Sequence, residues 1–318
     1  MAKYLITGVG GFIGSALARA VLAQGDTVRG IDNFSTGKRE NIAAIEDRIE
    51  LQEIDLKDAN ATREACAGVD FVLHQAAIPS VPKSVIDPVG SNQNNVDATM
   101  NLLVASKDAK VKRIVYAASS SAYGDTPTLP KREDMTPNPI SPYAVAKLSG
   151  ELYMTSFFRC YGLETVSLRY FNIFGPRQDP TSPYSGVLAR FITQMLGGEQ
   201  PTVFGDGTQS RDFTYVDNAV HANLLACEAA AEKVAGKVFN VATGERFDLN
   251  QTFEILKKLT AYNGDLKYTP ERAGDVKHSL ADLSLARKYL GYQPLVMFEE
   301  GLKRTIEWYR SQPQAVGV

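Results

Sequence analysis

Short apolar runs alternate with stretches of helical periodicity through the first half of the chain. In sequence order these segments read "KYLIT", "SALARAVLAQG", "TVRGID", "DFVLHQAA", "NLLVASKDAKV" and "RIVYAAS". Apolar runs of about five residues between amphipathic helices are typical of parallel strands that are covered by helices on both faces. The alternation therefore predicts an α/β protein that is built on a doubly wound parallel sheet.

The pattern changes near residue 176, within the polar, Pro-rich stretch "GPRQDPTSPYSG". A further strand is predicted just before it, in "ETVSLRYFNIFGP". Beyond it, short strand patterns ("TVFG", "VFNVA") are mixed with helical patterns ("DLNQTFEILKKL", "LSLARKYLG", "FEEGLKRTIEWYRS"). We expect a first domain over residues 1–176, with a return segment around 212–245, and a smaller mixed α/β lobe over 177–318. The ligands would lie in the cleft between them.

Composition narrows the class of protein. The 318 residues carry a formal net charge of −2, which does not favour a nucleic acid or an anionic membrane as a partner. Three cysteines and three histidines show no ligand spacing, so we expect no metal site and no disulfide framework, as in a reducing cytosol. Because the chain begins with a strand pattern and has no apolar run of about 18 residues, we expect a soluble cytoplasmic protein.

Three glycines with a spacing of three residues follow the first predicted strand. Gly8, Gly11 and Gly14 stand in "TGVGGFIGS", where the first predicted helix begins. Such glycines let the chain turn tightly and let a pyrophosphate approach the helix N-terminus, whose N–H groups and dipole favour an anion. A bare strand-to-helix turn would use glycines too, so the second strand has to decide between the two interpretations.

The second predicted strand ends in Asp32. A carboxylate at this place can accept both hydroxyls of an adenosine ribose, and it would repel a 2′-phosphate. The combination therefore predicts a Rossmann-type dinucleotide site that binds NAD rather than NADP. Asp55 in "EIDLKD" would lie near the adenine, or in water as a loop carboxylate, and the small residues of "HQAA" would let the cofactor lie flat.

A tyrosine and a lysine stand four residues apart in "SPYAVAKLSGE", just after a Ser-Pro pair where a helix would begin. One chance pair of this kind is expected in such a chain, so its neighbours must decide. On a helix, Tyr143 and Lys147 would share one face and reach one cofactor. A free phenol has a pKa of about 10, and nearby cations favour the phenolate. We therefore expect Lys147 and an oxidised nicotinamide ring to lower the pKa of Tyr143 and make it a base.

These motifs together resemble the extended short-chain dehydrogenase/reductase family. The glycine spacing, the serine cluster in "AASSSAYG" and the Tyr-x-x-x-Lys pair are similar to those of its nucleotide-sugar branch, the UDP-galactose and UDP-N-acetylglucosamine 4-epimerases, over essentially the whole chain. The resemblance implies an isomerase, an NAD-dependent UDP-hexose 4-epimerase. It would interconvert UDP-GlcNAc and UDP-GalNAc, and also UDP-Glc and UDP-Gal, through a 4-keto intermediate.

The resemblance also implies roles for individual residues. Ser119, Tyr143 and Lys147 match the catalytic residues of the family. Contacts to NAD are implied for Gly8, Gly11, Phe12, Ile13, Gly14, Asp32, Asn33, Ser35, Thr36, Gly37, Asp55, Leu56, Gln75, Ala76, Ala77, Lys83, Asn95, Tyr143, Lys147 and Tyr170. Contacts to the UDP-sugar are implied for Lys83, Ser119, Ser121, Tyr143, Asn172, Arg211, Arg272, Asp275 and Ser279.

Two features of the resemblance bear on the reaction. The 4,6-dehydratases of the family have Asp-Glu after the catalytic Ser/Thr and the decarboxylases have Glu at the second position, whereas this chain has Ser120 and Ser121. The missing acid favours oxidation and re-reduction at one carbon. Ser279 falls where enzymes restricted to UDP-Glc and UDP-Gal have a bulky Tyr, so a small residue there would leave room for a C2 acetamido group.

Alternative functions stay open from the sequence. A UDP-glucuronate 4-epimerase or another nucleotide-sugar modifying enzyme would keep the same motifs. A non-catalytic NAD-sensing protein would bind the cofactor, but it would not need Ser119, Tyr143 and Lys147 together. The helices that follow "SNQNNVDATMNLL" and "SPYAVAKLSG" carry apolar faces that would suit a four-helix seam in a homodimer, although packing on the sheet would also use such faces.

Overall fold

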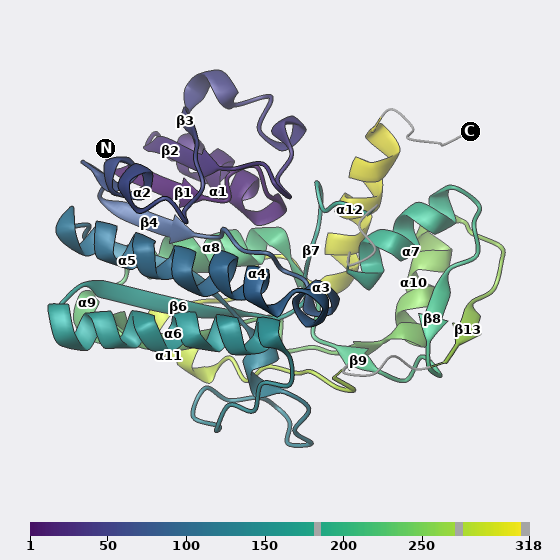
Figure 1. Ribbon diagram of the computed structural model, residues 1–318. Coiled ribbons are helices and arrows are strands. Elements are labelled where there is room, and N and C mark those ends of the chain that lie inside the picture. Colours follow the sequence, from purple (N-terminus) through teal and green to yellow (C-terminus); the bar gives the residue numbers. More distant parts are fainter. Residues whose placement is uncertain (181–185, 271–275, 313–318) are drawn as a thin grey trace.

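The computed structural model describes residues 1–180, 186–270 and 276–312, and Figure 1 labels its elements. Within these residues, seven parallel strands form one sheet in the order β11-β6-β5-β4-β1-β2-β3. Their bounds are Lys3–Thr7 (β1), Thr27–Asp32 (β2), Glu50–Glu53 (β3), Phe71–His74 (β4), Arg113–Ser119 (β5), Glu164–Tyr170 (β6) and Lys237–Val241 (β11). The predicted α/β class and the doubly wound, Rossmann-type sheet are confirmed.

The sheet buries side chains on both faces, as parallel strands between helices require. In β1, Tyr4 and Ile6 belong to the apolar core on one face, and Leu5 belongs to the core on the other. Figure 1 shows α5 and α6 in front of the sheet and α1 and α8 behind it. The helices that line the two cores are α2 (Ala59–Cys66), α5 (Ala98–Asp108) and α6 (Pro142–Tyr161) on one face, and α1 (Phe12–Ala23), α8 (Val216–Glu228) and α11 (Ser284–Leu290) on the other.

Several predicted elements agree with the structure residue for residue. "KYLIT", "TVRGID" and "RIVYAAS" are β1, β2 and β5, and "FEEGLKRTIEWYRS" is α12 (Phe298–Ser311). The predicted strand "ETVSLRYFNIFGP" instead forms β6 and a separate short strand, β7 (Ile173–Phe174). The strand is interrupted at Asn172, because its φ of 38° is in the left-handed region.

A second apolar core lies beside the sheet, at the right of Figure 1. Helices α7 (Val187–Leu196), α10 (Leu249–Thr260) and α12 surround it. The rings of Phe213 and Phe298 stack within it, with centroids 5.1 Å apart. Three short strand pairs flank this core, β7 with β10 (Thr214–Tyr215), β8 (Thr202–Phe204) with β13 (Lys267–Thr269), and β9 (Ser210–Arg211) with β12 (Phe247–Asp248).

The chain returns from this second core to the sheet. Helix α8 and strand β11 lie within residues 212–245, and β11 pairs with β6 at the edge of the sheet. Helix α11 packs on the same face as α8, a return that the sequence did not predict. The remaining helices are α3 (Val81–Ile86), α4 (Pro88–Asn92), a π-helical turn (Gln93–Asp97) and α9 (Ala231–Val234), with 3-10 turns at Arg39–Asn41, Glu46–Arg48 and Ser120–Tyr123. None of the described helices is long and apolar enough to span a membrane.

Candidate active site

The strand order reverses between β1 and β4, and doubly wound sheets bind ligands beyond the carboxyl ends of the strands at such a point. Gly8, directly after β1, has a φ of 70°, which glycine adopts without strain. A Cβ there would lie 2.9 Å from the Cα of Ala76, so glycine lets the two strand ends approach. Gly11 precedes α1, and a Cβ on Gly14 would collide with the carbonyl oxygen of Gly8. The glycines therefore permit this tight turn, and the binding of a pyrophosphate at the N-terminus of α1 stays a prediction.

The carboxylate of Asp32, at the end of β2, lies against the glycine-rich turn. Its Oδ2 accepts a hydrogen bond from the N–H of Gly10 at 2.9 Å, and its Oδ1 accepts one from the N–H of Phe34 at 2.8 Å. Burial raises the pKa of Asp32 above its ordinary value, although these hydrogen bonds oppose the rise. Because each carboxylate oxygen has two lone pairs, the group can still accept ribose hydroxyls. A Cβ on Gly37 would lie 2.8 Å from Oδ2, so the next turn also packs closely here.

Polar side chains after β2 and after β3 are joined by hydrogen bonds. The amide of Asn33 donates to Oδ2 of Asp55 at 3.0 Å, and the hydroxyl of Ser35 donates to Oδ1 of Asn33 at 2.8 Å. Leu56, the residue after Asp55, is buried in the apolar core on one face of the sheet. Of the predicted cofactor residues after β2 and after β3, Asn33, Ser35 and Asp55 are therefore linked by hydrogen bonds, and Asp55 is hydrogen-bonded rather than simply solvated.

The end of β1 is fixed to the end of β4 by a buried threonine. Oγ1 of Thr7 accepts hydrogen bonds from the N–H groups of Gln75 and Ala76, both at 3.1 Å, and lies 2.7 Å from Nδ1 of His74. Nε2 of His74 lies 2.9 Å from Oγ1 of Thr99. Burial lowers the pKa of His74 to about 3, so the imidazole is neutral and serves as a structural link.

A second buried network lies beyond β4. The hydroxyl of Tyr170 donates to Oε1 of Gln75 at 3.2 Å and accepts from Nδ2 of Asn223 at 2.6 Å. Nε2 of Gln75 in turn donates to Oδ1 of Asn223 at 3.3 Å. Two predicted cofactor residues, Gln75 and Tyr170, are thus held together by a third residue from α8.

The three predicted catalytic residues lie together at the carboxyl end of β5. Ser119 is the last residue of β5, and its Oγ accepts hydrogen bonds from the N–H and the hydroxyl of Ser121 at 3.2 and 2.8 Å. Ser141 caps α6, so Tyr143 is in the first turn of the helix and Lys147 is one turn later. A side-chain hydrogen bond links Ser119 to Tyr143. The arrangement joins a serine, a phenol and an amine at one end of the sheet.

Burial dominates the electrostatics of this group in the protein alone. Burial raises the pKa of Tyr143 above its ordinary value, and only the hydrogen bond with Ser119 opposes the rise. The ammonium group of Lys147 donates to the carbonyl of Ala117 at 2.9 Å and lies 5.0 Å from the centroid of the Tyr116 ring, and burial lowers its pKa to about 8. Lys147 is not among the groups that shift the pKa of Tyr143 in the protein alone, and the expected lowering by Lys147 together with an oxidised nicotinamide ring stays a prediction.

Two further predicted ligand residues, Lys83 and Asn95, differ in their exposure to solvent. Lys83 is exposed on α3, where Oγ of Ser84 accepts a hydrogen bond from the N–H of Tyr143 at 3.0 Å. Asn95 is buried in the π-helical turn, and its amide is paired with the backbone of Ile78 at 2.8 and 3.3 Å. Asn95 fixes the loop after β4, and the predicted contacts of both residues with ligands stay predictions.

Three predicted substrate residues lie close to one another after β6, in β9 and before α11. Nδ2 of Asn172 donates to Oγ of Ser279 at 3.2 Å and to the carbonyl of Asp212 at 3.0 Å. Nη1 of Arg211 donates to the carbonyls of Ser210 and Lys277, both at 3.0 Å. The structure brings these three residues together. The predicted substrate residues Arg272 and Asp275 lie outside the described residues.

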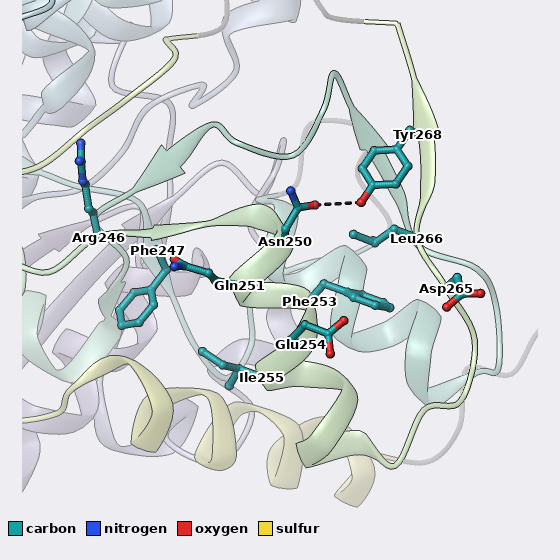
Figure 2. A pocket seen from close by; sticks show the side chains of 10 residues that line it. All are labelled: Arg246, Phe247, Asn250, Gln251, Phe253, Glu254, Ile255, Asp265, Leu266 and Tyr268. Atoms are coloured by element: carbon teal, nitrogen blue, oxygen red, sulfur yellow. Dashed lines mark hydrogen bonds between the residues drawn. The ribbon is translucent and has the colours of Figure 1, made fainter.

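A pocket of about 880 Å³ lies elsewhere, on the second core (Figure 2). Helix α10 and the segment before β13 line it, and the hydroxyl of Tyr268 donates to Oδ1 of Asn250 at 3.0 Å across its upper end. None of the predicted site residues lines this pocket. Among the described residues, no group of three or more His, Cys, Asp or Glu side chains is arranged to hold a metal ion.

Sequence reasoning missed three residues that organise the site. Thr7 stands directly before Gly8, so its position in the glycine-rich motif could have drawn attention to it. Asn223 is an ordinary polar residue of a helix, and no local pattern connects it with Gln75, which is 148 positions away. Asp212 follows Arg211 directly, yet only the folded chain shows that its carboxylate is wholly buried.

A dinucleotide site at a switch point, next to a Tyr-x-x-x-Lys pair at a helix start, is the arrangement of the extended short-chain dehydrogenase/reductases. The model of the NAD dependent epimerase/dehydratase family matches residues 4–242, and the chain belongs to this family. The resemblance that the motifs indicated is thereby confirmed. The predicted cofactor, NAD, is confirmed as the cofactor of the family, and the close backbone at Gly8 and the acceptor oxygens of Asp32 fit it.

Individual relatives cover almost all of the chain. The UDP-glucose 4-epimerase of Mycolicibacterium smegmatis is 36% identical over 316 residues, which are 98% of this chain and 100% of that protein. The structure of UDP-N-acetylglucosamine 4-epimerase from Methanobrevibacter ruminantium, in complex with UDP-N-acetylmuramic acid, has a TM-score of 0.93 at 42% identity and covers 98% of this chain and 99% of that one. The structure of UDP-glucuronic acid 4-epimerase from Bacillus cereus, in complex with UDP-glucuronic acid and NAD, has a TM-score of 0.88 at 34% identity, with coverages of 96% and 98%.

Proposed function

We propose that the chain is a UDP-hexose 4-epimerase that interconverts UDP-GlcNAc and UDP-GalNAc and also turns over UDP-Glc and UDP-Gal. The observation that carries the proposal is the hydrogen-bonded group of Ser119 and Tyr143 with Lys147 one helical turn away. Ser120 and Ser121 follow the catalytic serine, so these positions provide no carboxylate for elimination or decarboxylation. Relatives with epimerase names at 36 and 42% identity support the same class.

In this proposal the chain's own residues move one proton. The hydroxyl on carbon 4 of the sugar donates its proton to Tyr143, and Ser119 holds the same oxygen by a hydrogen bond. NAD, when bound, would take the hydride from carbon 4 and return it. Lys147, which donates to Ala117 in the protein alone, would turn to the cofactor and oppose the rise in the Tyr143 pKa that burial causes.

Inversion requires that the 4-keto sugar present both faces while the nucleotide stays bound. Asn172, Arg211 and Arg272 would hold the diphosphate, and Asp275 would accept hydrogen bonds from the uridine ribose. Strong anchoring of the nucleotide with few contacts to the sugar permits the sugar to turn about the diphosphate bonds. Specificity for the sugar would accordingly be modest.

The choice of sugar rests on Ser279. Its side chain is small and lies beside Asn172, so it would occupy less of the space for a substituent on carbon 2 than a Tyr would. This supports UDP-GlcNAc and UDP-GalNAc as substrates. The similarity to the Bacillus cereus enzyme at 34% identity keeps UDP-glucuronate as the alternative substrate.

The two ligands would bind to two different parts of the chain. Residues 1–176, with the return segment 212–245, would bind NAD, since they carry the switch point of the sheet. Residues 177–318 would bind the UDP-sugar around the second core. Asn172 and Arg211 lie at the junction of the two parts, where the reacting carbon and the nicotinamide would meet.

A homodimer is also proposed, and one apolar surface supports it. Val85 and Ile86 on α3 and Val89 on α4 are 63, 76 and 66% exposed, and Val145 and Leu152 on α6 are 50 and 61% exposed. Because α3 and α4 pack against α6, these side chains form one surface. The larger apolar side chains of α5 are buried or half-buried, so α3 and α4 replace α5 in the seam that the sequence indicated.

The experiment that tests the reaction uses three substrates in parallel. Purified protein is incubated separately with UDP-GlcNAc, UDP-Glc and UDP-glucuronate, with and without added NAD, and the products are followed by proton NMR. Inversion at carbon 4 is expected with UDP-GlcNAc and UDP-Glc. Carbon dioxide release, a lasting 4-keto product, or reversible NAD binding without conversion would each contradict the proposal.

A further inference from the structure

The carboxylate of Asp212 is a buried junction between distant segments. Asp212 lies between β9 and β10 and is 0% exposed. Its Oδ1 accepts hydrogen bonds from the N–H and the hydroxyl of Thr243 at 3.0 and 2.8 Å. Its Oδ2 accepts from the N–H groups of Gly244 and Ala281 at 3.1 and 3.2 Å. One side chain thus fixes the loop after β11 and the segment before α11.

The backbone of Asp212 makes two further contacts, both with predicted substrate residues. Its carbonyl accepts from Nδ2 of Asn172 at 3.0 Å, and its N–H points to Oγ of Ser279 at 3.4 Å. Arg211 is its direct neighbour. Ser279 is two residues before Ala281, which the carboxylate holds. Asn172, Arg211 and Ser279 are therefore each attached to Asp212 by a hydrogen bond or by one or two residues of backbone.

The donors around this carboxylate define its chemical state. Its four hydrogen bonds come from three backbone N–H groups and one hydroxyl. Burial raises the pKa of Asp212 to about 6, and the hydrogen bonds oppose the rise, so the group is ionised at neutral pH. Because neutral dipoles rather than a cation hold the charge, its position depends on the spacing of these segments.

We propose that Asp212 is a positioning residue for the UDP-sugar, which sets the spacing of Asn172, Arg211 and Ser279 without contacting the ligand. The inference rests on the proposed function, since it assumes that these three residues face a nucleotide sugar. The carboxylate of Asp212 would change the affinity for the substrate only through the segments that it joins. A purely structural carboxylate would lower stability without a selective effect on KM.

The decisive variant is Asp212→Asn. The amide keeps the size of the carboxylate but turns an N–H toward one pair of donors, which forces that segment to move. We expect the KM for UDP-GlcNAc to rise at least about tenfold, with kcat within about threefold of wild type. The content of bound NAD should not change, because no cofactor residue touches Asp212.

The matched control is Asn218→Asp, at a second buried junction. Asn218 is also 0% exposed, and its side chain accepts from the N–H groups of Leu295 and Val296 and donates to the carbonyl of Val296. This variant should lose a similar amount of thermal stability while its KM stays within about twofold of wild type. If Asp212→Asn does not fold, Thr243→Val removes one of the four hydrogen bonds and should give a smaller rise in KM.

Each outcome decides one question. An unchanged KM in a folded Asp212 or Thr243 variant overturns the inference, and so does an equal rise of KM in the Asn218 control. Calorimetric binding of UDP to the wild-type protein separates this failure from that of the proposed function. If the wild-type protein neither converts UDP-sugars nor binds UDP, the proposed function has failed and the inference falls with it.

Discussion

The side-chain amide of Asn172 donates a hydrogen bond to the hydroxyl of Ser279 over 3.2 Å, although 107 positions of sequence separate the two residues. Asn172 follows β6 in the sheet, whereas Ser279 belongs to the segment before α11. The residue assigned to the diphosphate and the residue assigned to the sugar are therefore in contact before a ligand binds. A substitution at one is expected to change the function of the other.

Replacing Ser279 by Tyr tests the assignment of the sugar. The larger side chain would occupy the space beside carbon 2, so we expect UDP-GlcNAc turnover to fall at least about tenfold while UDP-Glc turnover changes little. Competition assays with both substrates would measure the ratio of kcat/KM. Ser279→Ala is the control, since it removes only the hydroxyl. An equal loss for both substrates would place the acetamido group elsewhere.

Replacing Tyr143 by Phe tests the base. Removal of a general base costs about 10²- to 10⁴-fold in rate, and we expect kcat to fall in this range with NAD still bound. Tyr153→Phe is a matched control, because Tyr153 is on the same helix and is 39% exposed. NMR analysis of reactions quenched at fixed times would compare the kcat of the two variants. Activity that survives in Tyr143→Phe would remove the phenol from the mechanism.

The buried amine of Lys147 makes stability depend on pH. Burial lowers its pKa from the ordinary 10.5 to about 8, so the unfolded chain binds the proton more tightly than the folded one. The stability of the cofactor-free protein should therefore rise, by up to about 3 kcal/mol from this group, as pH increases from 8 to 10.5.

Urea unfolding of wild type and Lys147→Met across this pH range measures that contribution as the difference between the two curves. The methionine variant should lack the rise, because it has no titrating group. Other residues contribute equally to both proteins and cancel. If the two curves are parallel, burial does not lower the pKa of Lys147 in the folded protein.

Replacing Asp32 by Ala tests the ribose contact. Hydrogen bonds to a charged group are worth about 1.5–3 kcal/mol, so the Kd for NAD should rise roughly 10- to 150-fold. Asp32→Asn should bind NADP with less discrimination, because the repulsive charge is gone. Fluorescence titration with both cofactors would measure these constants.

The control for Asp32 is Asp58→Ala. Asp58 caps α2 by accepting hydrogen bonds from the N–H groups of Asn60 and Ala61, so its loss also removes a carboxylate that holds backbone donors. It should lower stability and leave the Kd for NAD unchanged. A similar loss of NAD affinity in both variants would mean that Asp32 affects NAD binding only through the backbone that it holds, and not through a contact with the ribose.

Charge introduced into the apolar surface tests the dimer. The double substitution Ile86→Asp with Leu152→Asp should convert a dimer to a monomer, because both side chains are exposed on the surface formed by α3, α4 and α6. Leu295→Asp, at a site with a similar exposure of 62%, is the control. Sedimentation velocity would report the mass. A monomeric wild type, or a dimer that survives the double substitution, would contradict the proposal.

The sequence alone was sufficient for the class of the sheet and for several of its strands. Apolar runs bounded by polar residues mark β1, β2 and β5 residue for residue, since strands buried on both faces read as nearly continuous apolar segments. The glycine spacing and Asp32 likewise lie on adjacent strand ends, so a local motif was enough to predict where a dinucleotide would bind. The pair of Tyr143 and Lys147 is local for the same reason, because one helical turn connects its members.

Only the tertiary structure decided the rest. The contacts of Gln75 with Asn223, of Asn172 with Ser279, and of Asp212 with three other segments join residues that share no motif. It also decided the electrostatics, because the pKa of Tyr143 depends on burial, which no spacing of residues reveals. Periodicity and spacing describe neighbours along the chain, whereas desolvation and long-range hydrogen bonds depend on neighbours in space.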